Sequence, residues 1–256
     1  MTASLLSHPL ISSRYFFPSP CRFAEPFRVD CGDAVLGCWY GRVDPAALTV
    51  IHFHGNGETV GDYLEEGFPE RFAHLGANLL LAEYRGYGMS TGEANLAAML
   101  ADVAKVIAAS GAVPARTVLF GRSVGSLFAV QGVSVVPGIA GLILESGLAD
   151  PLERLLLRLH PRELGATREE LAAALERELD QRSRLAAYRG KTLVLHARGD
   201  DLVDVSHGER LHAWAGGEKR LHLFERGTHN TILAVNGPDY FRLVGEFLQE
   251  VDHATA

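Results

Sequence analysis

Short runs of continuously apolar residues alternate along the chain with segments in which apolar residues recur at helical spacing. Such runs are typical of strands buried on both faces, which occur in parallel sheets covered by helices. We therefore expect strands at residues 34–43, 48–55, 78–84, 116–120, 139–146, 191–197 and 219–225. We expect helices at residues 63–76, 93–110, 124–134 and 239–251. The alternation predicts an α/β fold with a mostly parallel central sheet flanked by helices.

Residues 147–190 interrupt this alternation, because no strand pattern occurs there. Thr167 and Glu170 fit a capping box at the start of a helix. Leucines then recur every four residues on one face, at Leu171, Leu175 and Leu179. The segment is predicted to be a short helical insertion. It is either a lid over a site or a plain connecting pair of helices, and the sequence leaves both interpretations open.

The length and the charge of the chain limit which architectures and which partners are expected. Its 256 residues suit a single α/β domain, residues 1–256, with the insertion inside it. The formal net charge is −7, and no block of Lys or Arg stands out. This balance argues against nucleic acid and anionic membrane surfaces as partners.

The start of the chain and the cysteine usage bear on the compartment. Residues 1–20 lack the cationic start of a signal peptide, and His8 and Pro9 interrupt their apolar stretch. No apolar run approaches the roughly 20 residues that a membrane helix needs. The three cysteines are sparse, odd in number and without CxxC spacing, which favours a reducing compartment and no zinc site. We therefore expect a cytoplasmic protein without a metal ion.

The pattern G-x-S-x-G occurs twice, as GRSVG at 121–125 and as GMSTG at 88–92. It marks a nucleophilic serine on a tight turn, where small residues let a strand and a helix pass closely. Ser123 directly follows an expected strand and an apolar helix begins at once, so we expect it to be the nucleophile. A loop separates Ser90 from its strand, and we expect Ser90 or Thr91 to cap the next helix instead.

A serine nucleophile needs a base, usually a histidine oriented by a carboxylate. Of the eleven histidines, His229 follows the last expected strand on the carboxyl side of the sheet and is our candidate base. The loop RGDDLVD offers the acid: Asp200 comes first after the turn glycine, and Asp201 is the alternative. Asp204 fits better as a helix cap, and Glu145, at the end of an earlier strand, is a minor rival.

The segment HFHGNGE delivers a glycine-bearing loop beside the expected position of Ser123. The backbone N–H groups of Asn56 and Val124 are candidates to hold an oxyanion, since both belong to turns at the carboxyl edge of the sheet. The alternative is a glycine-rich turn without function.

These motifs together make the chain similar to α/β-hydrolase-fold serine hydrolases. HGNG, YRGYGMSTG and GRSVG follow three strands, and the order is Ser123, Asp200, His229. The likeness is greatest to the group that includes the membrane-associated depalmitoylase-like hydrolases and their bacterial relatives. There, a D-x-x-V-type acid loop followed by SHG and a G-x-H-N segment recur, which here read DDLVDVSHG and GTHN. The resemblance covers residues 34–251.

Carried over, the resemblance implies Ser123 as nucleophile, His229 as base, Asp200 as acid, and oxyanion amides at Asn56 and Val124. The acid loop reads HARGD where a glycine commonly follows the histidine, so Asp201 stays open as the acid.

The cysteines depart from the depalmitoylase pattern. Those enzymes carry a cysteine-rich segment that targets membranes, whereas Cys21, Cys31 and Cys38 are spread over a loop and a strand. Depalmitoylation of proteins at a membrane is therefore not implied for this chain.

The expected activity is hydrolysis of a small-molecule acyl ester or thioester through an acyl-enzyme, without a cofactor. An amidase or peptidase of the same fold is the enzymatic alternative. A catalytically silent binding module is the alternative from another class, because fold does not fix function.

Overall fold

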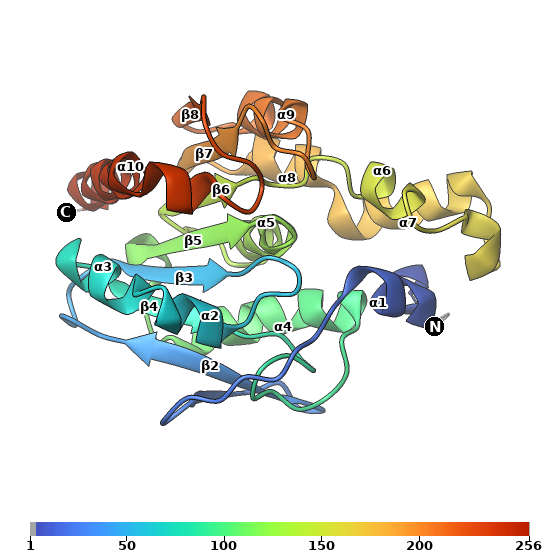
Figure 1. The fold of residues 1–256 in the computed structure, drawn as a ribbon, viewed down its shortest axis with the longest axis horizontal. Helices are drawn as coiled ribbons and strands as arrows, with labels where there is room; N and C mark the ends of the chain where they lie inside the picture. The colour runs from blue at the N-terminus through green and yellow to red at the C-terminus, as the bar shows by residue number, and fades with distance from the viewer. Residues whose placement is uncertain (1–3, 256) are drawn as a thin grey trace.

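The computed structural model of the protein describes residues 4–255. Its centre is an eight-stranded sheet that is parallel except at one edge (Figure 1). In spatial order the strands are β1 (Phe27–Asp30), β2 (Val35–Gly41), β4 (Asn78–Ala82), β3 (Thr49–Phe53), β5 (Thr117–Arg122), β6 (Gly141–Glu145), β7 (Lys191–Ala197) and β8 (Lys219–Phe224). Only the β1–β2 and β2–β4 pairs are antiparallel.

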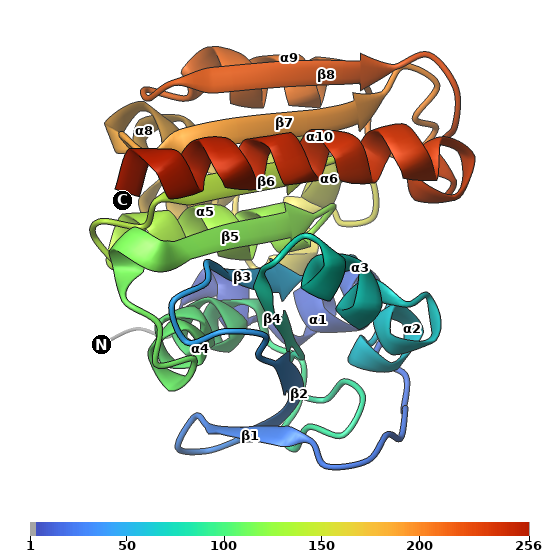
Figure 2. The ribbon, with the colours of Figure 1, turned by 90° about the vertical axis from the view of Figure 1, so that its left-hand side faces the viewer.

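Helices cover both faces of the sheet (Figure 2). One face carries α2 (Val60–Glu65), α3 (Phe68–His74) and α10 (Ile232–Thr255). The other carries α4 (Leu96–Ala109), α5 (Gly125–Val135), α8 (Gln181–Ala187) and α9 (Ser206–Trp214). The predicted fold, a mostly parallel sheet flanked by helices, is confirmed.

The side chains of the inner strands explain why their sequences are apolar throughout. In β5, Val118 and Phe120 pack into the core under α10, whereas Leu119 packs into the core under α5. Successive side chains of a strand point to opposite faces, so a strand covered on both sides needs apolar residues at every position.

The segment between β6 and β7 is helical, as expected. It holds α6 (Pro151–Leu156), a 3₁₀ turn η3 (Pro161–Leu164), α7 (Arg168–Leu179) and α8. The capping box is present: the Thr167 N–H donates to Glu170 Oε2 at 2.7 Å, and the Glu170 N–H donates to Thr167 Oγ at 3.1 Å. The three leucines at four-residue spacing are buried. A role of this segment as a lid stays a prediction.

Other expectations needed correction. The expected helix 63–76 is two helices, since Gly67 has a φ of +73° between them. The last helix begins at Ile232, well before the expected residue 239, and contains Pro238. A short turn η2 (Pro114–Arg116) precedes β5.

Elements at the start of the chain were not predicted. They are a 3₁₀ turn η1 (Leu5–Ser7), helix α1 (Pro9–Tyr15) and strand β1. Figure 1 shows α1 beside α6 and α7, near the carboxyl ends of the central strands. None of the helices between residues 4 and 255 is long and apolar enough to cross a bilayer.

Candidate active site

The turn from β5 into α5 carries Ser123 in a strained conformation, with a φ of +53°. A Cβ on Gly121 would lie 2.5 Å from the Gly125 carbonyl oxygen, and a Cβ on Gly125 would lie 2.0 Å from the Phe53 carbonyl oxygen. Only glycine fits at either position. The strand, the helix and the neighbouring strand β3 therefore meet around the serine, as a nucleophile elbow requires.

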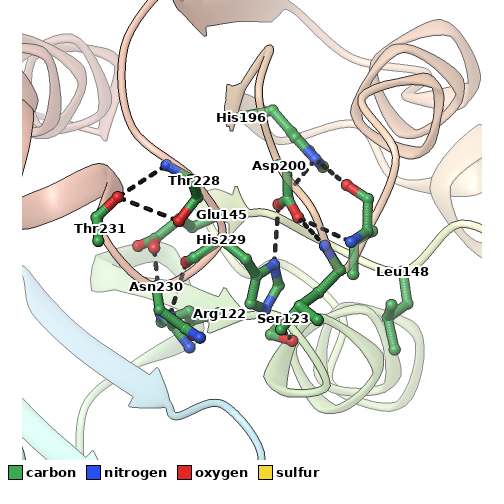
Figure 3. A network of polar contacts seen from close by, with 12 residues as sticks. Arg122, Ser123, Glu145, Leu148, His196, Asp200, Thr228, His229, Asn230 and Thr231 are labelled. Carbon is green, nitrogen blue, oxygen red and sulfur yellow. Dashed lines mark hydrogen bonds and ion pairs between the residues drawn. The ribbon is translucent and has the colours of Figure 1, made fainter.

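The structure brings Ser123, His229 and Asp200 together at the carboxyl edge of the sheet (Figure 3). Ser123 Oγ lies 2.9 Å from His229 Nε2, and His229 Nδ1 lies 2.8 Å from Asp200 Oδ2. His229 is buried and Ser123 is half-buried. The three groups thus form a continuous chain of hydrogen bonds from the sheet interior to an accessible hydroxyl.

The carboxylate of Asp200 is fixed by further donors. Its Oδ1 accepts from the N–H groups of Leu202 at 3.0 Å and Val203 at 2.7 Å. Two histidines approach Oδ2: His229, and His196 at 3.3 Å. Burial alone would raise the pKa of Asp200, but the hydrogen bonds from both histidines and the Val203 N–H outweigh it and hold the pKa well below 3.8.

An ionised Asp200 determines the tautomer of His229. The carboxylate can only accept, so His229 Nδ1 carries the proton and Nε2 presents its lone pair to Ser123. That is the arrangement a general base needs.

The rival carboxylates have other contacts. Asp201 is exposed, and Asp204 Oδ1 accepts from the Ser206 N–H at 2.9 Å, where α9 begins. Glu145 is buried, and its side chain contacts Arg122 and the hydroxyl of Tyr240.

The second G-x-S-x-G match lies in a loop beside β2. Ser90 Oγ accepts from the Gly37 N–H at 3.0 Å, and Thr91 Oγ accepts from the Val35 N–H at 2.8 Å. The cap of α4 is Asn95, whose Oδ1 accepts from the Ala98 N–H at 3.1 Å. The expectation that Ser90 or Thr91 caps this helix was therefore wrong, because both hydroxyls bind the strand edge.

The two candidate oxyanion amides come from the turn after β3 and from the turn between β5 and α5. Within residues 4–255, neither the Asn56 N–H nor the Val124 N–H has a hydrogen-bond acceptor. The loop that carries Asn56 is held by Glu58, whose Oε2 accepts from the Gly55 N–H at 2.6 Å. Two unpaired backbone donors in ordered turns can receive a developing negative charge.

The Asn56 side chain binds the N-terminal segment. Its Oδ1 accepts from the Tyr87 hydroxyl at 3.0 Å and from the Phe17 N–H at 3.2 Å, and its Nδ2 donates to the Tyr15 carbonyl. The end of α1 and the residues just after it therefore lie against the loop that carries Asn56.

Arg122, the residue before Ser123, was missed in the sequence. Its side chain is 11 % exposed and pairs with Glu58 and with Glu145, the latter at 3.2 Å. It also donates to the His229 carbonyl at 2.9 Å and to Asn230 Oδ1 at 3.3 Å. One buried guanidinium thus connects the loop of His229 with Glu58, which holds the loop of Asn56. Figure 3 shows Arg122 beside Glu145, His229 and Asn230. An arginine at the end of a fully apolar strand is the signal that could have indicated this role.

Thiol and metal chemistry find little support in the described part of the chain. Cys21, Cys31 and Cys38 are free, and burial raises the pKa of Cys31 and of Cys38 to about 12. Between residues 4 and 255, no three His, Cys, Asp or Glu side chains gather in a way that could hold a metal ion.

Comparison with known families identifies the family of the chain. Residues 44–184, more than half of the chain, match the family described as serine aminopeptidase, S33. The chain belongs to this family. The S33 match includes Ser123 and the loop of Asn56 but ends before the loops of Asp200 and His229.

Individual relatives extend the likeness beyond that range. The uncharacterized protein YfhR of Escherichia coli O157:H7 is 29% identical over 220 residues, covering 79% of this chain and 70% of its own. Alpha/beta hydrolase domain-containing protein 17C of Xenopus tropicalis is 28% identical over 182 residues, covering 68% of this chain and 53% of its own.

A solved structure with the same fold is alpha/beta hydrolase domain-containing protein 10 from mouse. It has a TM-score of 0.70 at 14% identity and covers 89% of this chain and 100% of its own. Together the matches place the chain among the α/β-hydrolases.

Proposed function

We propose that the protein is a serine hydrolase that cleaves carboxylic esters or thioesters of small molecules through an acyl-enzyme. The observation that carries this proposal is the pair of contacts of His229, 2.9 Å to Ser123 and 2.8 Å to Asp200, beside two unpaired amides. The proposal adds roles for these residues to the hydrolase family that the comparisons establish.

In the first half-reaction, Ser123 Oγ attacks the acyl carbonyl carbon while its proton passes to His229 Nε2. The carbonyl π electrons move to oxygen, and the amides of Asn56 and Val124 hold the resulting oxyanion. Collapse of the intermediate breaks the bond to the leaving group. The alcohol or thiol takes the proton from His229 and departs, which leaves an acyl ester on Ser123.

In the second half-reaction, water replaces the leaving group. His229 accepts a proton as the water oxygen attacks the acyl carbon, and a second oxyanion rests on the same amides. Collapse then expels the Ser123 oxygen, which regains its proton from His229. The products are a free carboxylic acid and the original enzyme, so no cofactor is required.

Esters and thioesters are favoured over amides because an alcohol or thiol is a better leaving group than an amine. The likeness to depalmitoylase-like hydrolases, which rests on the HGNG and GTHN segments, supports including thioesters. Peptide or amide hydrolysis is the alternative activity, and membership of a family described as serine aminopeptidase supports testing it. Matched p-nitrophenyl esters and p-nitroanilides of the same acyl group separate the two.

A fluorophosphonate probe tests the proposal directly, because it phosphonylates only an activated serine. Wild-type protein should be labelled, and Ser123→Ala should not. Ser90→Ala is the matched control: it removes the other serine of the same pattern and should leave labelling intact. Peptide mapping of the label should identify Ser123. Wild-type protein that resists the probe would support the silent binding module.

A further inference from the structure

A small cavity lies beside Val124, one of the two candidate oxyanion residues. The N-terminal segment contributes Ile11, Tyr15 and Phe16 to its wall, and α5 and the turn before it contribute Val124 and Leu127. The surface that faces the cavity is apolar throughout, and it encloses about 40 Å³. The wall offers no partner to a charged or hydrogen-bonding group of a ligand, so the cavity suits a hydrocarbon chain.

One candidate oxyanion residue borders this cavity, and the other is hydrogen-bonded to a residue of its wall. Val124 lines it directly, and its N–H is one candidate donor. Asn56 carries the other, and its side chain donates to the carbonyl of Tyr15, which also lines the cavity. On the far wall, the Leu148 N–H donates to Ser126 Oγ at 2.9 Å, which in turn donates to the Ser123 carbonyl at 2.6 Å. An acyl carbonyl held at the Val124 N–H would therefore place its chain next to this space.

The N-terminal segment that closes the cavity is fastened to the 147–190 insertion. Tyr15 Oη donates to the carbonyls of Arg154 at 2.7 Å and Leu155 at 2.5 Å. Arg14 donates to the Arg158 carbonyl at 2.8 Å, and Arg158 donates to the Arg14 carbonyl at 3.1 Å.

An ion pair and a stacked cation add to this attachment. Arg14 pairs with Glu163 at 2.7 Å, and the Arg158 guanidinium lies over the ring of Tyr15 at 5.7 Å and that of Phe17 at 5.3 Å. Figure 1 shows α1 at the same end of the molecule as α6. Helix α1 and α6 thus form one cover over the cavity.

The volume limits what the cavity accepts. A single water needs about 10–15 Å³ on the same measure, so 40 Å³ holds roughly three carbon-sized groups. That is the alkyl part of an acetyl to butyryl group. Longer chains require Phe16, which is 5% exposed, to move out of the wall.

We propose that Phe16 and helix α1 restrict the acyl group to short chains, which makes Phe16 the determinant of acyl specificity. This inference rests on the proposed function, since it concerns the acyl group delivered to Ser123. It assigns the substrate class as esters or thioesters of carboxylic acids with about two to four carbons.

The test compares two adjacent phenylalanines. Phe16→Ala removes a ring from the cavity wall, whereas Phe17→Ala removes an exposed ring, 46% accessible, that does not line it. We measure kcat/KM for p-nitrophenyl acetate, butyrate, hexanoate and octanoate. Wild-type protein and Phe17→Ala should prefer acetate or butyrate and fall steeply at hexanoate.

For Phe16→Ala the preference should shift toward hexanoate and octanoate. Each methylene that gains apolar surroundings is worth about fourfold, so the octanoate-to-acetate ratio should rise at least tenfold. Most of the change should appear in KM, because the triad is untouched. Phe16→Leu, a milder truncation, should shift the ratio in the same direction by a smaller factor. It provides the test if the alanine variant does not fold.

The outcomes separate this inference from the proposed function. Ser123-dependent fluorophosphonate labelling together with a wild-type preference for octanoate would overturn the chain-length restriction alone. An unchanged ratio in folded Phe16→Ala or Phe16→Leu would do the same. If no probe labels Ser123 and no ester is hydrolysed, the proposed function fails, and the acyl restriction fails with it.

Discussion

The guanidinium of Arg122 donates a hydrogen bond to the backbone carbonyl of His229 at 2.9 Å, across 107 positions of sequence. The same side chain pairs with Glu58, which accepts from the N–H of Gly55 next to the oxyanion loop residue Asn56. The loops of the candidate base and of the candidate oxyanion amide are therefore joined through one side chain, which belongs to the residue before Ser123.

Replacing Arg122 with glutamine should lower kcat about 10- to 100-fold with little change in KM. The loops of His229 and Asn56 lose their shared anchor, and misplacing a catalytic group by about 1 Å can cost ~10²-fold in rate. Steady-state kinetics on folded protein measure the effect.

The control for this variant is Arg85→Gln. Arg85 is equally buried, with its side chain 7% exposed and paired with Asp102 and Asp33, but it lies outside the candidate site. It should lose stability without the loss of kcat per folded molecule. A wild-type kcat in Arg122→Gln would show that the anchor is dispensable.

The acid assignment predicts different effects for two neighbouring aspartates. Asp200→Asn keeps the shape of the side chain but no longer favours the His229 tautomer that accepts from Ser123, so kcat should fall by ~10⁴. Asp201 is exposed, and Asp201→Asn should stay within about twofold of wild type. A large loss from Asp201→Asn with little from Asp200→Asn would reverse the assignment.

The conformation of Ser123 predicts that the nucleophile is held at a cost in stability. Its φ of +53° is unfavourable for any residue with a Cβ, by about 1–2 kcal/mol, and glycine recovers part of this despite its greater unfolded entropy. Urea unfolding should therefore find Ser123→Gly more stable than Ser123→Ala by up to about 1 kcal/mol. Equal stability of these two inactive variants would argue against strain in the turn.

His52 should make the fold sensitive to mild acid. It packs among the rings of Tyr63, Phe68 and Phe120, and burial, followed by the charges of His54 and Arg122, lowers its pKa well below 6.5.

The unfolded chain then binds a proton at His52 that the folded chain does not. This contribution to stability is fully present above about pH 6.5 and is lost below it, by up to about 1.4 kcal/mol per pH unit. Thermal unfolding from pH 7.5 to 5.5 should show a smaller loss for His52→Phe than for wild type. Parallel losses in both proteins would place the acid sensitivity elsewhere.

The sheet and the nucleophile were predictable because their signals are local. Buried strands need an apolar residue at every position, and the elbow needs glycines where backbones nearly touch. Both requirements can be recognised in short stretches of sequence, the second of them in GRSVG. The cap of α4 was mispredicted because serine, threonine and asparagine all cap helices, and only the strand edge beside Ser90 decides which one does.

The position of helix α1 could not be predicted in the same way. Helix α1 has seven residues, too few to be stable alone, and its position is set by distant partners such as Asn56 and Arg158. Arg122 was missed for the same reason: its partners come from two loops and from the end of β6, which only the fold brings together.

The attachment of α1 to α6 has a consequence for engineering. Helical insertions after β6 are natural units to exchange between related enzymes, but here the inserted segment shares its inner surface with residues 11–16. A chimaera that receives only a foreign 147–190 segment would bring together two surfaces that are not complementary to each other. Transplanting the substrate preference of this protein therefore requires moving both ends of the cover, the N-terminal helix and the insertion, as one part.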